Sequence, residues 1–295
     1  DTRVHQVPAP RIPEMLAAQD ESVLAERVRS GNAYEATQLY IGQMGRLGQA
    51  GDAQGGEDLG FRAAGVLLEA GEAACATTVI LRALDSMSVR KASVDSAVGD
   101  KLIGLLGVYE TCGAVDAGAQ KLSVAKVACR LAPQHGMLHA VYGKDLQSLG
   151  RFAEAAKALA RADSPKDYAS LLTQWAGQGY QGEQDLFVAR AVVHLLAVGK
   201  AQQAVELHRE MGARSSTPLD HFISCLIQLV ELQFAYQVGK EGSSRAFQAL
   251  LQGYTPSIAR DGGLRSLVLT AGQKQFGWVP RASPLQSMLS SFLGG

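Results

Sequence analysis

A turn glycine followed by a helix start rich in small residues recurs along this chain, and it limits the fold more than any other feature. The recurrences begin at Gly31, Gly71, Gly113, Gly150 and Gly199, with a weaker one at Gly242. Their spacing is loose around roughly forty residues, the length of one helical hairpin and closer to armadillo-type units than to the shorter tetratricopeptide units. Such hairpins cannot bury their apolar faces alone, so they must stack.

Apolar residues recur at three- and four-residue steps, as in Ala36, Leu39, Tyr40, Met44 and Leu47. Strict alternation is nearly absent, so a sizeable sheet is not expected. We therefore predict an all-α, right-handed α-solenoid of tetratricopeptide-like hairpin repeats, continuous through residues 12–150 and 151–295. Left-handed glycines are expected to end helices at Gly31, Gly71, Gly150, Gly177, Gly199 and Gly239.

Two local patterns support the helical interpretation. Ser164 and Thr217 each precede a proline and then an acidic residue, the pattern of a helix N-cap. An alanine lies five residues after several of the turn glycines, where a small side chain lets two helices approach closely. These alanines are Ala36, Ala76, Ala155 and Ala204.

The composition excludes several classes of protein. The chain has 28 basic and 28 acidic residues and no basic cluster, which argues against nucleic-acid binding. Four scattered cysteines without a CxxC pair are typical of a reducing compartment, and the first residues lack the apolar core of a signal peptide. No apolar stretch is long enough to span a bilayer. We expect a cytosolic protein without direct membrane insertion.

Catalytic motifs are missing from the sequence. It has no phosphate-binding loop, no GxSxG elbow and no HExxH pattern. His135 and His139 are four residues apart, a spacing that can hold a metal, but no third ligand lies nearby. The carboxylate pairs at Asp20–Glu21 and Glu57–Asp58 are expected to be solvated. We predict a protein that binds other proteins, with no enzymatic activity, no cofactor and no metal.

Five segments in order resemble the Golgi-to-ER traffic protein four family, an adaptor family of the pathway that guides tail-anchored proteins into the endoplasmic reticulum. They are GNAYEATQ from Gly31, DLFVARAV from Asp185, YTPSIARD from Tyr254, GQKQFG from Gly272, and MLSSFLGG from Met288. Residues 283–295 also carry an amphipathic stripe, which we expect to be a docked last helix. The resemblance covers nearly the whole chain and implies a non-enzymatic α-solenoid.

The resemblance also implies two partners. The N-terminal half would bind the targeting ATPase in its nucleotide-bound closed form, and the C-terminal half would clasp the N-terminal segment of a ubiquitin-like protein. In animals the same half also meets a Bag-family chaperone scaffold. The implied ATPase-binding residues are Tyr34, Glu35, Gln38, Arg46, Glu72 and Thr78. The implied residues for the ubiquitin-like partner are Leu219, Phe222, Leu226, Leu229, Tyr254, Pro256 and Phe276.

Two departures from the family pattern concern these surfaces. Thr78 stands where relatives tend to carry an acidic residue, so a charge that would pair with a basic patch on the ATPase is missing. Only Gly212 to Thr217 remains where many relatives carry a longer hairpin-like insertion. Two alternatives stay open: a generic repeat scaffold that binds an unrelated peptide, and a metalloenzyme that uses His135 and His139.

Overall fold

The computed structural model describes residues 12–212, 217–236 and 240–279. Within these ranges the chain is helical and contains no strand, which confirms the predicted all-α class. The chain divides into two compact units, residues 1–145 and 146–295, and each is described by itself below. None of the described helices has the length and apolar character needed to cross a bilayer.

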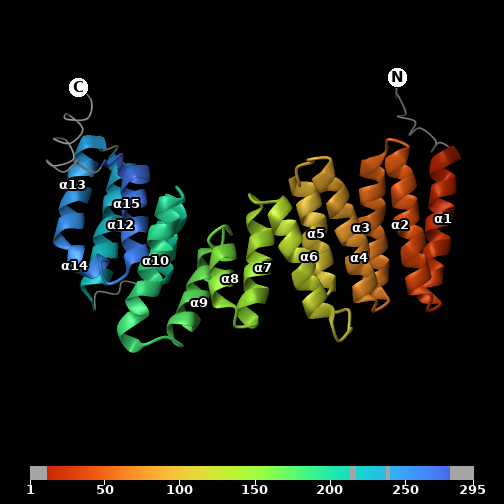
Figure 1. Ribbon diagram of the computed structural model, residues 1–295, viewed down its shortest axis with the longest axis horizontal. Coiled ribbons are helices and arrows are strands. Elements are labelled where there is room, and N and C mark those ends of the chain that lie inside the picture. The colour runs from red at the N-terminus through yellow and green to blue at the C-terminus, as the bar shows by residue number, and fades with distance from the viewer. Residues whose placement is uncertain (1–11, 213–216, 237–239, 280–295) are drawn as a thin grey trace, which may run out of the picture. The chain divides into compact units, whose positions relative to one another are not determined.

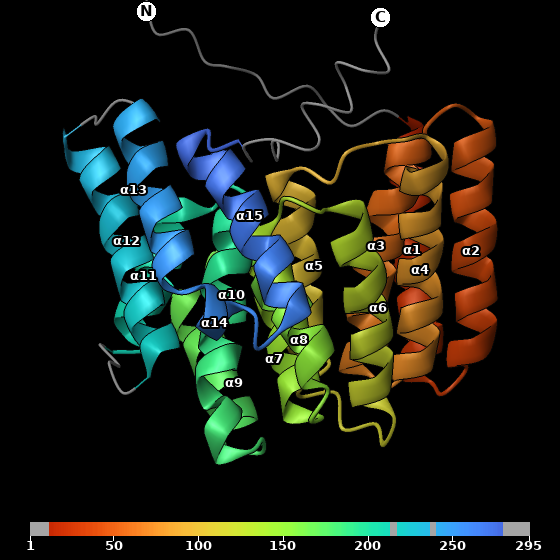
Figure 2. The ribbon, with the colours of Figure 1, turned by 60° about the vertical axis from the view of Figure 1, so that its left-hand side comes forward.

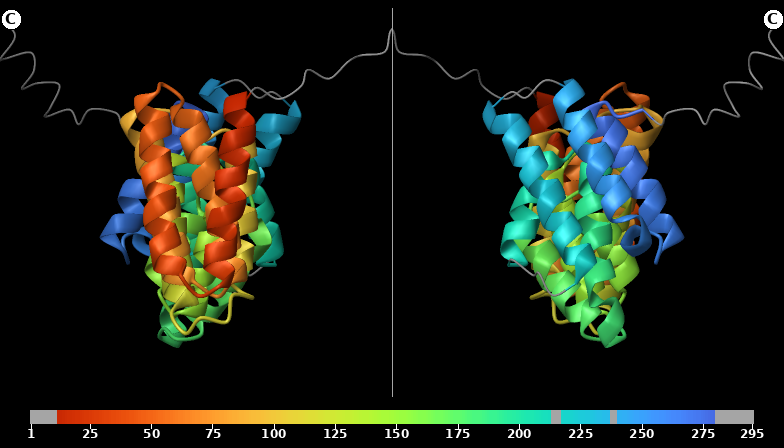
Figure 3. Two further views of the ribbon diagram at one scale, coloured as in Figure 1. Left: turned by 90° about the vertical axis from the view of Figure 1, so that its right-hand side faces the viewer. Right: turned by 90° about the vertical axis from the view of Figure 1, so that its left-hand side faces the viewer.

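The first unit is a two-layered stack of helices. One layer contains α1, α3 and α5, and the other contains α2, α4 and α6 (Figures 1 and 3). The bounds are α1 Ile12–Arg29, α2 Ala33–Gln49, α3 Ala53–Glu69, α4 Ala73–Val89, α5 Ser96–Val108 and α6 Ala117–Leu131, and α7 (Gly136–Ser148) begins in this unit and ends in the second. Neighbours such as α2 and α3, or α3 and α4, form the hairpins that the glycine pattern predicts.

Helices α1 to α4 end in the same way, at positions twenty residues apart along the chain. Gly31, Gly51, Gly71 and Lys91 have φ values of 89°, 87°, 83° and 53°, all in the left-handed region. After α2, for example, the Asp52 N–H donates to the Leu47 carbonyl (2.9 Å), the Schellman arrangement that satisfies terminal carbonyls. The forty-residue period is therefore two helix-plus-turn lengths.

The glycine prediction is confirmed at four turns. Gly31, Gly71, Gly150 and Gly199 all have positive φ. It is wrong at Gly177, whose φ of −64° is right-handed because the chain continues through further turns before α10. Gly239 lies outside the described residues, as does the stripe predicted over residues 283–295.

Small residues lie where the hairpin helices pack. Ala36, Ala76, Ala155 and Ala204 are fully buried, as predicted. Gly56 lies at the corresponding place after Gly51, and a β-carbon there would come within 3.0 Å of the Met44 carbonyl oxygen. The position therefore accepts only the smallest side chains.

The second unit contains helices of very unequal length, from the four residues of α14 to the nineteen of α12, and one long-range return. Its elements are α8 Phe152–Leu159, α9 Pro165–Ala176, the 3-10 turn η1 Gln181–Glu183, α10 Gln184–Ala197, α11 Ala201–Glu210, α12 Pro218–Tyr236, α13 Lys240–Gly253, α14 Thr255–Ile258 and α15 Gly262–Phe276. Although distant in sequence, α15 packs along α10, as Figure 2 shows, and it also contacts α13.

The two predicted N-caps differ in detail. Thr217 accepts a hydrogen bond from the Asp220 N–H (3.1 Å), which is the predicted capping contact. Ser164 does precede α9, and Pro165 is in its first turn. Its hydroxyl, however, donates to the Asp167 carboxylate (2.7 Å), so the side chain caps no backbone N–H group.

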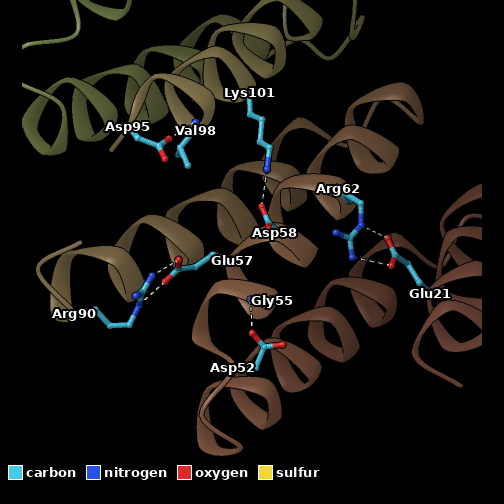
Figure 4. A network of polar contacts seen from close by, with 10 residues as sticks. All are labelled: Glu21, Asp52, Gly55, Glu57, Asp58, Arg62, Arg90, Asp95, Val98 and Lys101. Atoms are coloured by element: carbon cyan, nitrogen blue, oxygen red, sulfur yellow. Dashed lines mark hydrogen bonds and ion pairs between the residues drawn. The ribbon is translucent and has the colours of Figure 1, made fainter. Parts of the chain in front are cut away.

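Ion pairs link neighbouring helices of the first unit, and Asp52 caps the start of α3 through the Gly55 N–H (Figure 4). Arg62 of α3 binds Glu21 of α1 (2.9 Å), and Lys101 of α5 binds Asp58 of α3 (2.7 Å). The carboxylate of Glu57 was expected to be solvated, and that expectation is wrong. Its side chain is only 5% exposed, because Arg90 binds it with a shortest distance of 2.6 Å.

Candidate partner-binding surfaces

The residues predicted to face an ATPase all lie in the first unit and are all exposed. Four of them are on α2, Thr78 is on α4, and Glu72 is the residue before α4. Tyr34 is 72% exposed, an unusual position for a large aromatic side chain that no core contact requires. We refer to these six residues as the α2–α4 face.

The helical repeat relates two members of the α2–α4 face to each other. Gln38 and Thr78 lie forty residues apart in sequence, so they occupy equivalent positions in successive hairpins of the same layer. Glu35 is within 3.8 Å of Arg27, and both side chains are about half or more exposed, so this pair adds little stability. Thr78 directs its hydroxyl to the Ala74 carbonyl (2.9 Å) in its own helix.

A hollow of about 470 Å³ lies between the last turns of α2 and α4, above the start of α3. Gly45 and Gly48 form the α2 wall, and Arg82 and Val89 are on the α4 wall. The Glu57–Arg90 ion pair also lines it. Sequence reasoning missed this hollow. Glycines inside a helix do not show whether their open side faces a pocket or simply faces solvent.

The residues predicted for the ubiquitin-like partner divide into two groups. Leu219, Phe222, Leu226 and Phe276 are 0% exposed and belong to the core of the second unit. In this structure they support the surface from behind and present no side chain to a partner. The accessible residues are Leu229, Tyr254 and Pro256.

Leu229 and Tyr254 line a groove of about 430 Å³ between α12 and α13. The full lining is Cys225, Gln228, Leu229 and Leu232 from α12 with Ala246, Ala249, Leu250 and Tyr254 from α13 and its end. We call it the α12–α13 groove. None of its lining residues carries a charge, and the alanines of α13 leave room for another helix to approach closely.

Tyr254 marks one end of the α12–α13 groove. Its ring packs against Phe222 (5.6 Å between centroids), and its hydroxyl is hydrogen-bonded to the His221 ring. Toward the other end of α12, Leu232 is 48% exposed and Tyr236 is 74% exposed. Cys225, Leu229, Leu232 and Tyr236 recur at helical spacing, as the lining of a groove would. The sequence alone does not separate this stripe from the buried stripe of the same helix.

Buried polar contacts fix the start of α12. Arg260 binds both carboxylate oxygens of Asp185 (2.6 and 3.2 Å), and the Thr217 hydroxyl donates to the same carboxylate (2.9 Å). The Asp185 side chain is 4% exposed. A second ion pair joins Arg190, also on α10, to Asp261, the residue after Arg260 (2.5 Å). These contacts join α10 to the segment before α15 and to the cap of α12.

The two histidines of the metal hypothesis are used in packing. His139 is 2% exposed, and the His135 ring lies against Gly99, where a β-carbon would overlap it. Among the described residues no group of three or more His, Cys, Asp or Glu side chains is placed to hold a metal ion.

Comparison with known proteins gives a consistent result. The model of the family described as Golgi to ER traffic protein 4 matches residues 54–293. The chain is 24% identical to Protein GET4 of Arabidopsis thaliana over 90% of this chain and 91% of that protein. It is 26% identical to the Golgi to ER traffic protein 4 homolog of Oryzias latipes over 93% and 87% of the two chains.

A solved structure shows the same fold. The crystal structure of C. therm. Get4 superimposes with a TM-score of 0.69, covers 94% of this chain and 96% of its own, and shares 23% identity. That likeness covers the helical stack and return helix described above. Because the family model matches well over half of the sequence, this chain belongs to the Golgi to ER traffic protein 4 family.

Proposed function

We propose that this protein is a non-enzymatic, cytosolic adaptor in the targeting of tail-anchored membrane proteins to the endoplasmic reticulum. It would bridge a targeting ATPase, bound at the α2–α4 face, and a ubiquitin-like partner, bound at the α12–α13 groove. A Bag-family chaperone scaffold is a further candidate partner for the second unit. The observation that carries the proposal is family membership over residues 54–293.

The chemistry of the two surfaces supports two different kinds of partner. The α2–α4 face mixes an exposed aromatic ring at Tyr34 with polar and charged side chains, which suits reversible binding. The α12–α13 groove is lined by uncharged, mostly apolar side chains, which suits the apolar side of a helix. One chain with both surfaces can hold two partners at once.

The ATPase assignment is tested by isothermal titration calorimetry of the full chain with the ATPase, with and without ATP. We expect tighter binding with ATP, and we expect Tyr34→Ala combined with Gln38→Ala to weaken it at least tenfold, since exposed aromatic anchors carry much of an interface's energy. Asp100→Ala, exposed on α5 in the other layer, is the matched control and should bind normally. Equal weak binding with and without ATP would contradict the assignment.

Thr78 gives a second test of the same surface. If a basic patch on the ATPase faces this position, Thr78→Glu restores the missing charge and should raise the association rate several-fold at low salt. The gain should disappear at high ionic strength, because screening weakens exposed charge pairs. Stopped-flow measurements at two salt concentrations make the comparison. No change at low salt would mean that the patch lies elsewhere or that Glu72 already pairs with it.

The groove assignment is tested by co-expression with the N-terminal segment of the ubiquitin-like partner. We expect the two to elute together, and we expect Leu229→Lys to separate them, because a buried unpaired charge opposes docking. Gln252→Lys adds the same charge to an exposed position of α13 outside the groove and serves as the control. Separate elution of the wild-type pair would refute the assignment and favour a generic scaffold.

A further inference from the structure

The α12–α13 groove leaves apolar side chains exposed to water if no partner is present. Leu232 of the groove is 48% exposed, and Tyr236, one helical turn further along α12, is 74% exposed. Covering these side chains with another apolar surface would be favourable, because it removes them from water. We propose that residues 285–293 of the same chain occupy the α12–α13 groove until a partner displaces them. This proposal rests on the proposed function only for the identity of the displacing partner.

Sequence and groove match in chemistry. Residues 285–293 place five apolar side chains at positions i, i+3, i+4, i+7 and i+8, namely Leu285, Met288, Leu289, Phe292 and Leu293. No charged residue occurs between 282 and 295, and none lines the groove. The occupant therefore brings no charge that would have to lose its water. A helix with charged residues beside its apolar stripe would fit this groove less well, because the groove offers no charged partner.

The anchor before this segment lies on α13, one wall of the groove. The Trp278 indole N–H donates to the Gln248 side chain (2.5 Å), and its ring packs against Phe247 (5.6 Å between centroids). Gln248 is the neighbour of Ala249, which lines the groove. The chain is thus fixed beside the helix that it would have to cross.

The connecting residues are long enough to make the crossing. Five residues, 280–284, separate the last described residue from Leu285. Fully extended, they span about 17 Å, since each residue contributes about 3.4 Å. An α-helix with its side chains is about 10–12 Å across. Half the circumference of such a helix is about 16–19 Å. The extended segment matches this path around α13, and a tether this short gives a local concentration on the order of millimolar.

The native thiol of Cys225 reports occupancy, because it lines the groove and is only partly buried. The experiment uses the full chain with Cys75→Ser and Cys112→Ser, which removes the other two partly exposed thiols and leaves Cys129 buried. The rate of reaction with a small aromatic disulfide is then measured without any partner.

Leu289→Ser combined with Phe292→Ser removes two apolar anchors of the segment. We expect the thiol of Cys225 to react at least threefold faster in that variant. The matched control, Gln286→Ala with Ser290→Ala, changes the polar side of the same segment and should react at the parent rate. Circular dichroism at equal concentration checks that all variants keep the same helix content.

Two results would overturn the proposal. One is an equal reaction rate in the parent and in the Leu289→Ser, Phe292→Ser variant. The other is protection that grows with protein concentration, which would mean that a second copy of the chain covers the groove. Because no partner is added, failure of this test leaves the partner assignment standing. Conversely, Cys225 could be protected by the segment while neither proposed partner binds in the calorimetry and co-expression tests. That outcome would refute the proposed function and leave the occupant of the groove established.

Discussion

Lys91 offers a test in which removing a side chain should stabilise the protein. It occupies the fourth left-handed turn of a series whose other members are Gly31, Gly51 and Gly71, and its φ is 53°. The hydrogen bonds of the turn are nevertheless intact, with the Ala92 N–H donating to the Met87 carbonyl (2.9 Å). The lysine therefore bears the steric cost of a conformation that glycine adopts freely.

The expected magnitude follows from two opposing terms. A β-carbon in the left-handed region costs roughly 1–2 kcal/mol, because it approaches the following carbonyl oxygen. Glycine loses about 0.5–1 kcal/mol through its greater freedom in the unfolded chain. Lys91→Gly should therefore raise the free energy of unfolding by about 0.5–1 kcal/mol. For a unit of this size that is about 1–4 °C in melting temperature.

Urea unfolding followed by circular dichroism measures the change, and the slope with urea should stay constant. Lys91→Ala is the decisive control: it removes the charge and the long side chain but keeps the β-carbon, so it should leave stability nearly unchanged. Gly51→Ala should cost about 1 kcal/mol, since its β-carbon would meet no atom within 4 Å and only the φ of 87° opposes it. If Lys91→Ala stabilised as much as Lys91→Gly, the argument from backbone conformation would be refuted.

Other contacts make further predictions. Arg260→Gln should lower the free energy of unfolding by about 2 kcal/mol, because it leaves the buried carboxylate of Asp185 without its main partner; calorimetry showing no loss would contradict this. Gly272→Ala should also destabilise, since the new β-carbon would overlap the Phe247 ring, and the effect should shrink when Phe247→Leu is added. Burial lowers the pKa of Lys121, but hydrogen bonds to two carboxylates outweigh it and raise the pKa. Its contribution is therefore complete below the unfolded pKa of about 10.4 and lost as pH rises through the folded pKa. Urea titrations at several alkaline pH values should show this loss, and Lys121→Met should flatten the profile.

The sequence predicted the helical hairpins because glycine and alanine have local reasons to be where they are. A left-handed turn needs glycine whatever surrounds it, and a close helix crossing needs a small side chain. The same logic missed two turns of the series: Lys91, where a non-glycine residue adopts the left-handed conformation, and Gly51, which was passed over although it is a glycine. Gly177 failed for the opposite reason, because a glycine can also adopt right-handed backbone.

The binding surfaces were harder to predict because burial is a property of the whole fold. On α12, Leu226 and Leu229 are three residues apart and equally apolar, yet Leu226 is in the core and Leu229 lines the groove. Only the positions of α10 and α13 decide which side faces water. On α2 the structure shows that Tyr34 and its polar neighbours are exposed, and their role in binding stays a prediction.

The segments that revealed the family show why recognising a fold and locating a site are different problems. Asp185 and Arg190 come from one such segment, and Arg260 and Asp261 from another. In the structure they form two ion pairs, Asp185 with Arg260 and Arg190 with Asp261, that fasten α10 to the chain before α15. These residues hold the second unit together, and none of them lines the α12–α13 groove. Residues that maintain a fold identify it well, whereas the surface that binds a partner has to be found from exposure and shape.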